Sequence, residues 1–262
     1  MRAAARLVRV LGLPVALVLA WWAVTAGEDN FYFPPPTTVA TTFVDVWVSG
    51  RLLDDVLPSV GRLLAGLALA LAAGVGLGLL IGLSPRVRAV FEPALEFLRA
   101  IPPPVLVPVM LLVAGVGDRM KILVILSGCL WPILLNTVEG ARSVDEVLGD
   151  TCRCYGIQGA ARIRHLVLRA ASPQIMTGIR QALSIGIILM VISEMFAASS
   201  GLGFAILQFQ RGFQIPEMWS GMVVLSLIGV TLSVIFRQVE RRVLAWHQGP
   251  RKRERAEGVR DA

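Results

Sequence analysis

The residue types that most often carry chemistry are few in this chain, and their spacing does not assemble a reactive centre. The sequence has three cysteines and two histidines. Cys152 and Cys154 are too close for a zinc knuckle, and the two histidines, His165 and His247, have no partners at ligand spacing. No G-x-S-x-G, H-E-x-x-H or G-x-x-x-x-G-K-[ST] pattern occurs. We therefore predict no catalytic residue, no metal site and no cofactor bound by this chain.

One acidic residue stands out by its position. Glu194 lies within the predicted membrane span at about residues 179–198. Ionisable residues within a membrane segment are costly and usually face a cavity or a partner. Two roles remain open for Glu194: a pathway or gating residue, or a hydrogen bond to a neighbouring helix near the outer surface.

A polar stretch from Glu139 to about Gly178 carries the clearest functional spacing. Gly156 is suited to end a short helix in a left-handed turn, and a second helix is expected to start over residues 158–168. This second helix has an apolar and a basic face, formed by Ala160, Ile163 and Val167 and by Arg162, Arg164 and Arg169. Such a helix can lie on a membrane or dock into a groove on a soluble partner.

The elements that position these residues are apolar blocks. The chain has 262 residues, of which 55% are hydrophobic and 16% charged, whereas soluble domains are about one quarter charged. A membrane-spanning helix needs roughly 20 apolar residues, and spans in lipid must satisfy their own backbone groups. We predict an all-α polytopic membrane protein with six spans, at about 8–26, 59–82, 105–116, 120–138, 179–198 and 218–236. Glycines at 66, 74, 76, 78 and 82 should let a neighbouring helix approach the second span closely.

Prolines make the third span unusual. Pro102, Pro103 and Pro104 lead into it and Pro108 lies inside it. Prolines interrupt the helical ladder and persist in membranes where neighbours or a cavity satisfy the freed groups. We expect a kinked helix, which either lines a pathway or is kinked without a role in transport.

Basic residues set the orientation. All but five of the 25 Lys and Arg residues fall in segments 1–9, 83–99, 139–180 and 237–262. The positive-inside rule then places both termini and the 139–178 loop in the cytoplasm and residues 27–58 outside. The net charge of +7 is explained in this way, so no nucleic-acid partner is expected. Residues 37–48 are expected to form a short surface helix, and the first block also fits a cleaved signal peptide.

The polar stretch resembles the EAA loop of ABC importer permeases, whose pattern is E-A-A, three residues, Gly, nine residues and then I-x-L-P. Gly156 keeps the spacing, and Leu166 and Leu168 supply the hydrophobic pair. Asp150-Thr151-Cys152 replaces E-A-A, and Arg169 stands where proline is expected. Residues 33–36, 98–103, 107–108, 155–157, 164–165 and 194–203 are similar to segments of the nitrate, sulfonate and taurine permease family. The resemblance covers residues 30 to 246.

This resemblance implies a type I (MetI-like) permease subunit in a bacterial plasma membrane. Two copies would face each other, with cytoplasmic ATPase subunits that bind ATP and Mg, and an extracytoplasmic binding protein that delivers the solute. The implied regions are an N-terminal helix (1–28), an extracytoplasmic segment (29–58), a core (59–246) that includes the loop 139–178, and a basic tail (247–262). The implied ATPase-coupling residues are Asp150, Tyr155, Gly156, Ile157, Gly159, Arg164, His165 and Leu168. The pathway or gating candidates are Pro102, Pro103, Pro108, Glu194, Ser199, Gly201 and Gly203.

The solute and the energy source have alternatives. The resemblance favours an organosulfonate, taurine or a nitrate-like anion, and related permeases carry pyrimidine-type vitamin precursors. An ion-gradient-driven transporter would need more intramembrane acids or broken-helix repeats in both halves. An intramembrane enzyme would need one of the motifs that are missing.

Overall fold

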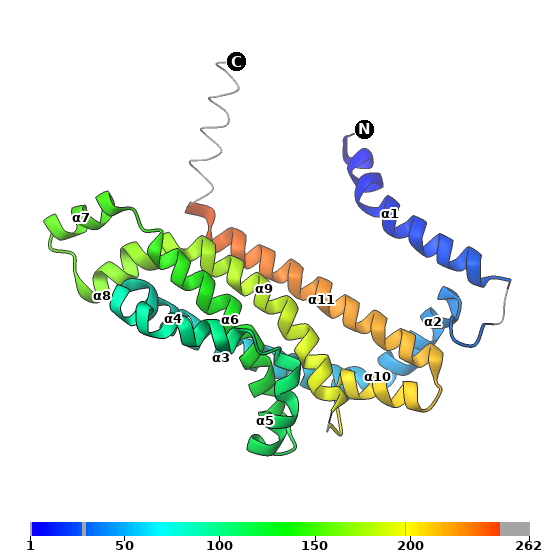
Figure 1. Ribbon diagram of the computed structural model, residues 1–262. Helices are drawn as coiled ribbons and strands as arrows, with labels where there is room; N and C mark the ends of the chain where they lie inside the picture. Colours follow the sequence, from blue (N-terminus) through cyan, green and yellow to red (C-terminus); the bar gives the residue numbers. More distant parts are fainter. Residues whose placement is uncertain (1, 28–29, 197, 247–262) are drawn as a thin grey trace. The chain divides into compact units, whose positions relative to one another are not determined.

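The protein is described by a computed structural model over residues 2–27, 30–196 and 198–246 (Figure 1). Helices dominate it, and the described residues contain no strand. The helices are α1 (Arg2–Thr25), α2 (Pro36–Phe43), α3 (Leu57–Leu83), α4 (Pro85–Arg99), α5 (Leu106–Ala114), α6 (Asp118–Arg142), α7 (Glu146–Cys154), α8 (Gly159–Arg162), α9 (Leu168–Met195), α10 (Leu202–Arg211) and α11 (Ile215–Val243). The basic tail predicted for 247–262 lies outside the described residues.

The chain divides into two compact units, each with its own packing. One unit comprises Met1–Val60 and Ala198–Leu227, and the other comprises Gly61–Ala197 and Ile228–Ala262. The second unit contains most of α3, all of α4 to α9, and the last part of α11.

Glycines bring α3 against α6 in the second unit. A Cβ added to Gly78 would lie 2.6 Å from Cβ of Thr137, and one added to Gly74 would lie 2.8 Å from Cγ2 of Ile133. Gly66 and Gly82 face α6 at similar spacing, whereas a Cβ on Gly76 would meet nothing within 4 Å. The predicted close approach is confirmed at four of the five glycines, because small residues let two backbones come near each other.

Helices α6 and α9 pack side by side along their length (Figure 1). A Cβ on Gly178 would lie 2.6 Å from the carbonyl oxygen of Pro132, so the two backbones nearly touch there. The Sγ–H of Cys129 donates to the carbonyl oxygen of Ala182 at 3.2 Å. Cys129 is therefore a packed core residue of this helix pair.

The proline stretch breaks the third span. Helix α4 ends at Arg99, a 3-10 turn occupies Pro103–Val105, and α5 follows from Leu106. The two parts are bent by 74°. A break is expected here, because three consecutive prolines supply no N–H groups and each disfavours helical backbone in the residue before it.

Four described helical segments are long and apolar enough to cross a membrane: Pro36–Leu83, Asp118–Arg142, Gly159–Met195 and Ile215–Val243. The bent α4–α5 pair makes a fifth if it counts as one span, and the apolar part of α1, Gly12–Thr25, is shorter. This arrangement is compatible with the six predicted spans.

Two predicted boundaries are wrong. The expected short helix at 37–48 is not separate: α2 continues through a π-helical stretch, Val44–Val56, into α3, interrupted only by the non-helical backbone of Gly50. The helix predicted to start near 158 does not end near 168 but runs on into α9, and it is helical from Gly159 to Met195. Apolar runs mark only the part of a helix that lies in lipid, so a helix of good formers can extend well beyond them.

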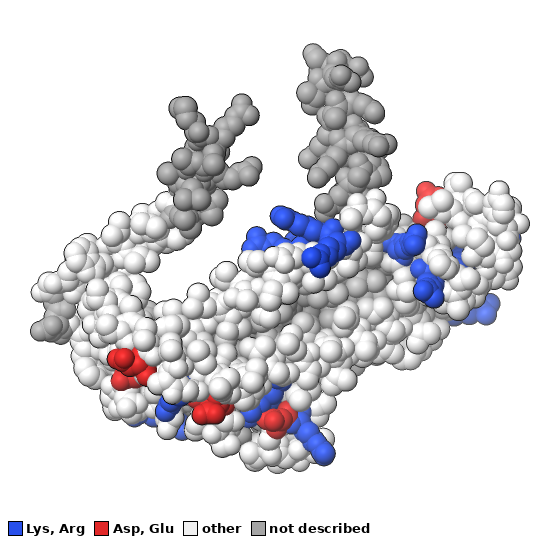
Figure 2. Space-filling model, turned by 180° about the vertical axis from the view of Figure 1, so that it is seen from behind, with Lys and Arg blue, Asp and Glu red and all other residues white. Residues whose placement is uncertain are grey.

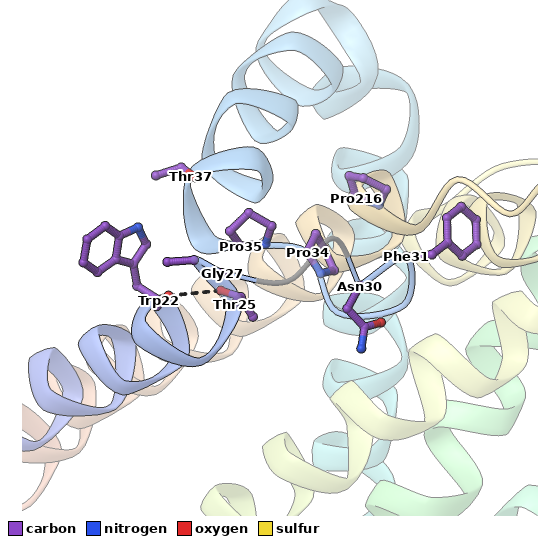
Figure 3. Close-up of a pocket in the computed structure, with 10 residues that line it drawn as sticks. Trp22, Thr25, Gly27, Asn30, Phe31, Pro34, Pro35, Thr37 and Pro216 are labelled. Atoms are coloured by element: carbon purple, nitrogen blue, oxygen red, sulfur yellow. Dashed lines mark hydrogen bonds between the residues drawn. The ribbon is translucent and has the colours of Figure 1, made fainter.

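The first unit is organised around aromatic residues. The rings of Trp21, Phe33 and Trp219 lie with centroids 5.3 to 5.9 Å apart. The buried indole N–H of Trp47 donates to Oγ of Ser220 at 2.9 Å. Beside the end of α1, a cavity of about 730 Å³ is lined mainly by Trp22, the segment around Asn30 to Pro35, and Pro216 (Figure 3). Clustered tryptophans suit the boundary between lipid and water.

Candidate functional site

The loop between α6 and α9, residues 143–167, is built from two capping arrangements. Asp145 begins α7, since its Oδ1 accepts hydrogen bonds from the backbone N–H groups of Val147 and Leu148 at 2.8 and 3.2 Å. At the other end, the N–H of Ile157 donates to the carbonyl of Cys152 and the N–H of Gly156 to that of Arg153. These two bonds form a Schellman motif, which requires the left-handed φ of 69° found at Gly156. The predicted left-handed turn is confirmed.

This turn presents apolar side chains on the surface. Tyr155 is 80% exposed and Ile157 is 39% exposed. On α7, Val147 and Leu148 are also exposed. Large apolar groups that are grouped on a polar loop mark a surface for a partner.

The remaining predicted loop residues lie on either side of the turn. Gly159, with φ of 57°, starts α8. Arg164 and His165 are exposed, while Leu168 is half-buried at the start of α9. Asp150 forms an ion pair with Arg153 on its own helix at 2.9 Å. The loop therefore gathers the predicted set at one end of α6 and α9.

The predicted pathway residues are divided between the two units. Pro102 and Pro108 are exposed, and Pro103 is half-buried next to Gly128 of α6. Ser199, Gly201 and Gly203 belong to the other unit. There the N–H of Gly201 donates to Oδ1 of Asp55 at 3.0 Å, and Asp55 lies in the stretch Val44–Val56, so the start of α10 is fixed to that stretch. Asp55 was not among the predicted residues.

Four charged side chains form the charge cluster: Arg62 on α3, Asp118 and Lys121 on α6, and Glu194 on α9. The guanidinium of Arg62 donates to Glu194 Oε1 and to Asp118 Oδ1, each at 2.7 Å. Nζ of Lys121 lies 3.8 Å from Asp118 Oδ1. The cluster lies at the end of α6 and α9 opposite the loop, because Asp118 begins α6 and Glu194 is next to last in α9.

Burial makes this charge cluster unusual. The side chains of Arg62, Lys121 and Glu194 are almost completely buried, whereas that of Asp118 is 64% exposed. Buried charges are tolerated when they are paired and hydrogen-bonded, and here two cations face two carboxylates. Of the two roles left open for Glu194, the hydrogen bond to a neighbouring helix is present.

The sequence reasoning missed Arg62 as the partner of Glu194, and it missed Asp118 and Lys121 as members of the cluster. The available signal was the position of Arg62 just inside an apolar block, since an intramembrane arginine needs a carboxylate partner. Nothing in the local spacing identifies that partner, which lies 132 residues away.

The chain is similar to known proteins. The model of the family "Binding-protein-dependent transport system inner membrane component" matches residues 74–244. The chain is 30% identical over 234 residues to the putative aliphatic sulfonates transport permease protein SsuC of Bacillus subtilis, which covers 88% of this chain and 85% of that protein. It is 28% identical to the taurine transport system permease protein TauC of Escherichia coli, over 90% of this chain and 89% of that protein.

The chain is also similar to one further permease and to a chain of a solved transporter structure. The bicarbonate transport system permease protein CmpB of Synechococcus elongatus is 27% identical, over 88% of this chain and 89% of that protein. A solved inward-facing structure of the MetNI methionine ABC transporter contains a chain that superposes with a TM-score of 0.63 at 18% identity. The match covers 76% of this chain and 97% of that one, and it shows the shared fold.

Proposed function

The chain belongs to the family of binding-protein-dependent transport system inner membrane components, the permease subunits of ABC importers, and on that premise we propose which solute it carries and how it is driven. We propose that the solute is a small anion, of the organosulfonate, taurine or nitrate-like kind. Relatives named for aliphatic sulfonates, taurine and bicarbonate support this class, because all three are small solutes that carry an anionic oxygen group.

The proposed orientation places residues 143–167 and both termini in the cytoplasm. The basic segments support it through the positive-inside rule. The charge cluster then lies toward the outer surface, since it occupies the opposite ends of α6 and α9. The proposed regions are the N-terminal helix 1–28, the outer segment 29–58, the core 59–246 and the tail 247–262.

One observation carries the proposed coupling: the Schellman turn at Gly156 presents Tyr155 and Ile157 on an exposed loop. We assign this loop to a cleft on a partner ATPase, which binds ATP and Mg. The proposed contact set is the predicted one: Asp150, Tyr155, Gly156, Ile157, Gly159, Arg164, His165 and Leu168. The loop joins α6 directly to α9, so a push on it reaches both helices of the tightly packed pair as a rigid-body motion.

The proposed assembly has two copies of this chain, two ATPase subunits and an outer binding protein. Glu194, Pro102, Pro103 and Pro108 are the proposed pathway or gating residues of the second unit, and Ser199, Gly201 and Gly203 those of the first. The bend at the proline break and the buried charges support this assignment. Both features are costly within a membrane segment, and such features usually have a functional role.

Co-purification tests the coupling. The tagged full chain is expressed with its candidate ATPase, as wild type and as Tyr155→Ala. The expected result is an ATPase that is retained by wild type and reduced at least about tenfold with the variant, since a buried aromatic anchor often contributes more than 1.4 kcal/mol. Phe213→Ala is the matched control, because Phe213 is an exposed aromatic in the turn before α11. Equal retention by wild type and Tyr155→Ala would remove the loop from the interface.

A further inference from the structure

A basic pocket lies between α9 and α11, apart from both regions described above. It has a volume of about 530 Å³ and its walls come from two segments, Arg180 to Ser184 on α9 and Ser233 to Arg241 on α11. In Figure 2, Lys and Arg atoms form a blue group beside the end of α11, on a surface that is otherwise mostly white. The polar walls thus interrupt a largely apolar pair of helices.

The pocket has more positive than negative groups. Its charged members are Arg180, Arg237, Arg241 and Glu240. Both carboxylate oxygens of Glu240 accept hydrogen bonds from Nη2 of Arg180. Within residues 2–27, 30–196 and 198–246, neither Arg237 nor Arg241 forms an ion pair; Nε of Arg237 donates only to the carbonyl of Ser233 on its own helix. Two guanidinium groups therefore remain without a carboxylate.

The chemistry of the lining selects one kind of ligand. Guanidinium groups present forked donors that match phosphate and sulfonate oxygens in a bidentate way. The hydroxyls of Ser184 and Ser233 add donors in the same walls, while Leu183 and Phe236 supply apolar surface. Arg237 and Arg241 are exposed and form no ion pair among the described residues, so an anion from outside the chain can pair with both guanidinium groups.

We propose that α9 and α11 form a binding site for an oxyanion of the phosphate or sulfonate type. Two sources offer this chemistry. One is the phosphate of an anionic lipid headgroup, which basic pockets between membrane helices recognise. The other is a free small sulfonate, in which case the pocket holds the transported solute; this second source rests on the proposed function, and the first does not.

Binding to the purified full chain in neutral detergent tests the site with two probes. Phosphatidylglycerol retention is measured by native mass spectrometry against phosphatidylcholine, and ethanesulfonate binding is measured by calorimetric titration. The variant is Arg237→Gln with Arg241→Gln. The matched control is Arg86→Gln with Arg242→Gln, which removes the same charge from exposed positions that do not line the pocket.

The expected result is binding of at least one probe that is about tenfold weaker in the pocket variant and unchanged in the control. Glu240→Gln gives an independent check: it releases Arg180 from its carboxylate, so it should strengthen binding, whereas a merely structural role would weaken it. Retention of the lipid alone identifies a headgroup site, and binding of ethanesulfonate identifies a small-anion site.

Equal weakening in both double variants, or no binding of either probe to the wild type, would overturn the proposal. Neither measurement needs an ATPase. If the wild-type chain retained no ATPase while its oxyanion binding stayed intact, the result would therefore count against the proposed function and leave this site standing.

Discussion

The charge cluster and the 143–167 loop lie at opposite ends of α6 and α9, and they are built in opposite ways. The cluster draws Arg62, Asp118 and Glu194 from three helices, across separations of 56 and 132 residues. The loop is contiguous, and its structure comes from local caps at Asp145 and Gly156. One region depends on the whole fold and is buried, while the other depends on a few neighbouring residues and is exposed.

This difference separates stability from coupling. Breaking the charge cluster leaves a charge buried without its partner, so the cost falls on the folded state. Changing the loop removes surface that only a partner would bury, so the cost falls on association. Stability and ATPase retention, measured on the same variants, should therefore respond to different ends of the molecule.

The largest expected effect comes from Glu194→Ala, which leaves the buried guanidinium of Arg62 with one partner fewer. Loss of one member of a buried pair typically costs about 3–5 kcal/mol. The measurement is the temperature at which the detergent-solubilised chain loses its monodisperse elution peak. The control is Glu194→Ala combined with Arg62→Met, which removes both charges and should recover much of the loss. A single variant as stable as wild type would show that the cluster does not hold the helices together.

Helix packing between α3 and α6 gives the second largest effect. Gly78→Leu places a side chain where even a Cβ would lie 2.6 Å from Thr137, and overpacking of this kind costs about 1–3 kcal/mol or more. Gly76→Leu is the matched control on the same helix, because nothing lies within 4 Å of its added Cβ. The same elution assay should show a clear loss for the first variant and little change for the second. Equal losses would mean that helix propensity, and not contact with α6, decides the result.

These two variants also mark what the sequence could predict. The glycine positions were readable, because their spacing reports the face of one helix. The turn at Gly156 was also readable, because a Schellman motif involves only neighbouring residues, here 152–157. The partners of Glu194 were not, because the pairing is decided by how three helices pack. The length of α9 was also missed, because an apolar run shows which residues lie in lipid and does not show where the helix begins.

Gly156→Ala probes the loop itself. Compared with the two preceding variants, it should change stability less and ATPase retention more. A non-glycine residue at φ of 69° costs about 1 kcal/mol. We expect a small loss of thermal stability together with reduced ATPase co-purification, since the turn that presents Tyr155 is distorted. Gly115→Ala is the matched control, because Gly115 has φ of 72° in the turn before α6. Because Gly115 has ψ of −178°, a conformation that is essentially restricted to glycine, this control should cost at least as much stability, and it should retain the ATPase. Loss of the ATPase from both variants would assign the effect to general strain.

The smallest expected effect is that of Asp150→Ala, which removes a carboxylate from an arginine pair just as Glu194→Ala does. Here the two side chains are 69% and 68% exposed, so water solvates Arg153 once its partner is gone. Exposed pairs contribute about 0.2–1 kcal/mol, and salt screens them further. The elution temperature should fall by little at low salt and not at all at 0.5 M NaCl, whereas the loss caused by Glu194→Ala should persist at both. If Asp150→Ala destabilised the chain as much as Glu194→Ala, the loop would have to be packed against the core, and the separation of stability from coupling would fail. If instead only the loss caused by Glu194→Ala persists at high salt, removal of the same carboxylate group costs different amounts of stability at the two sites, and the difference comes from burial.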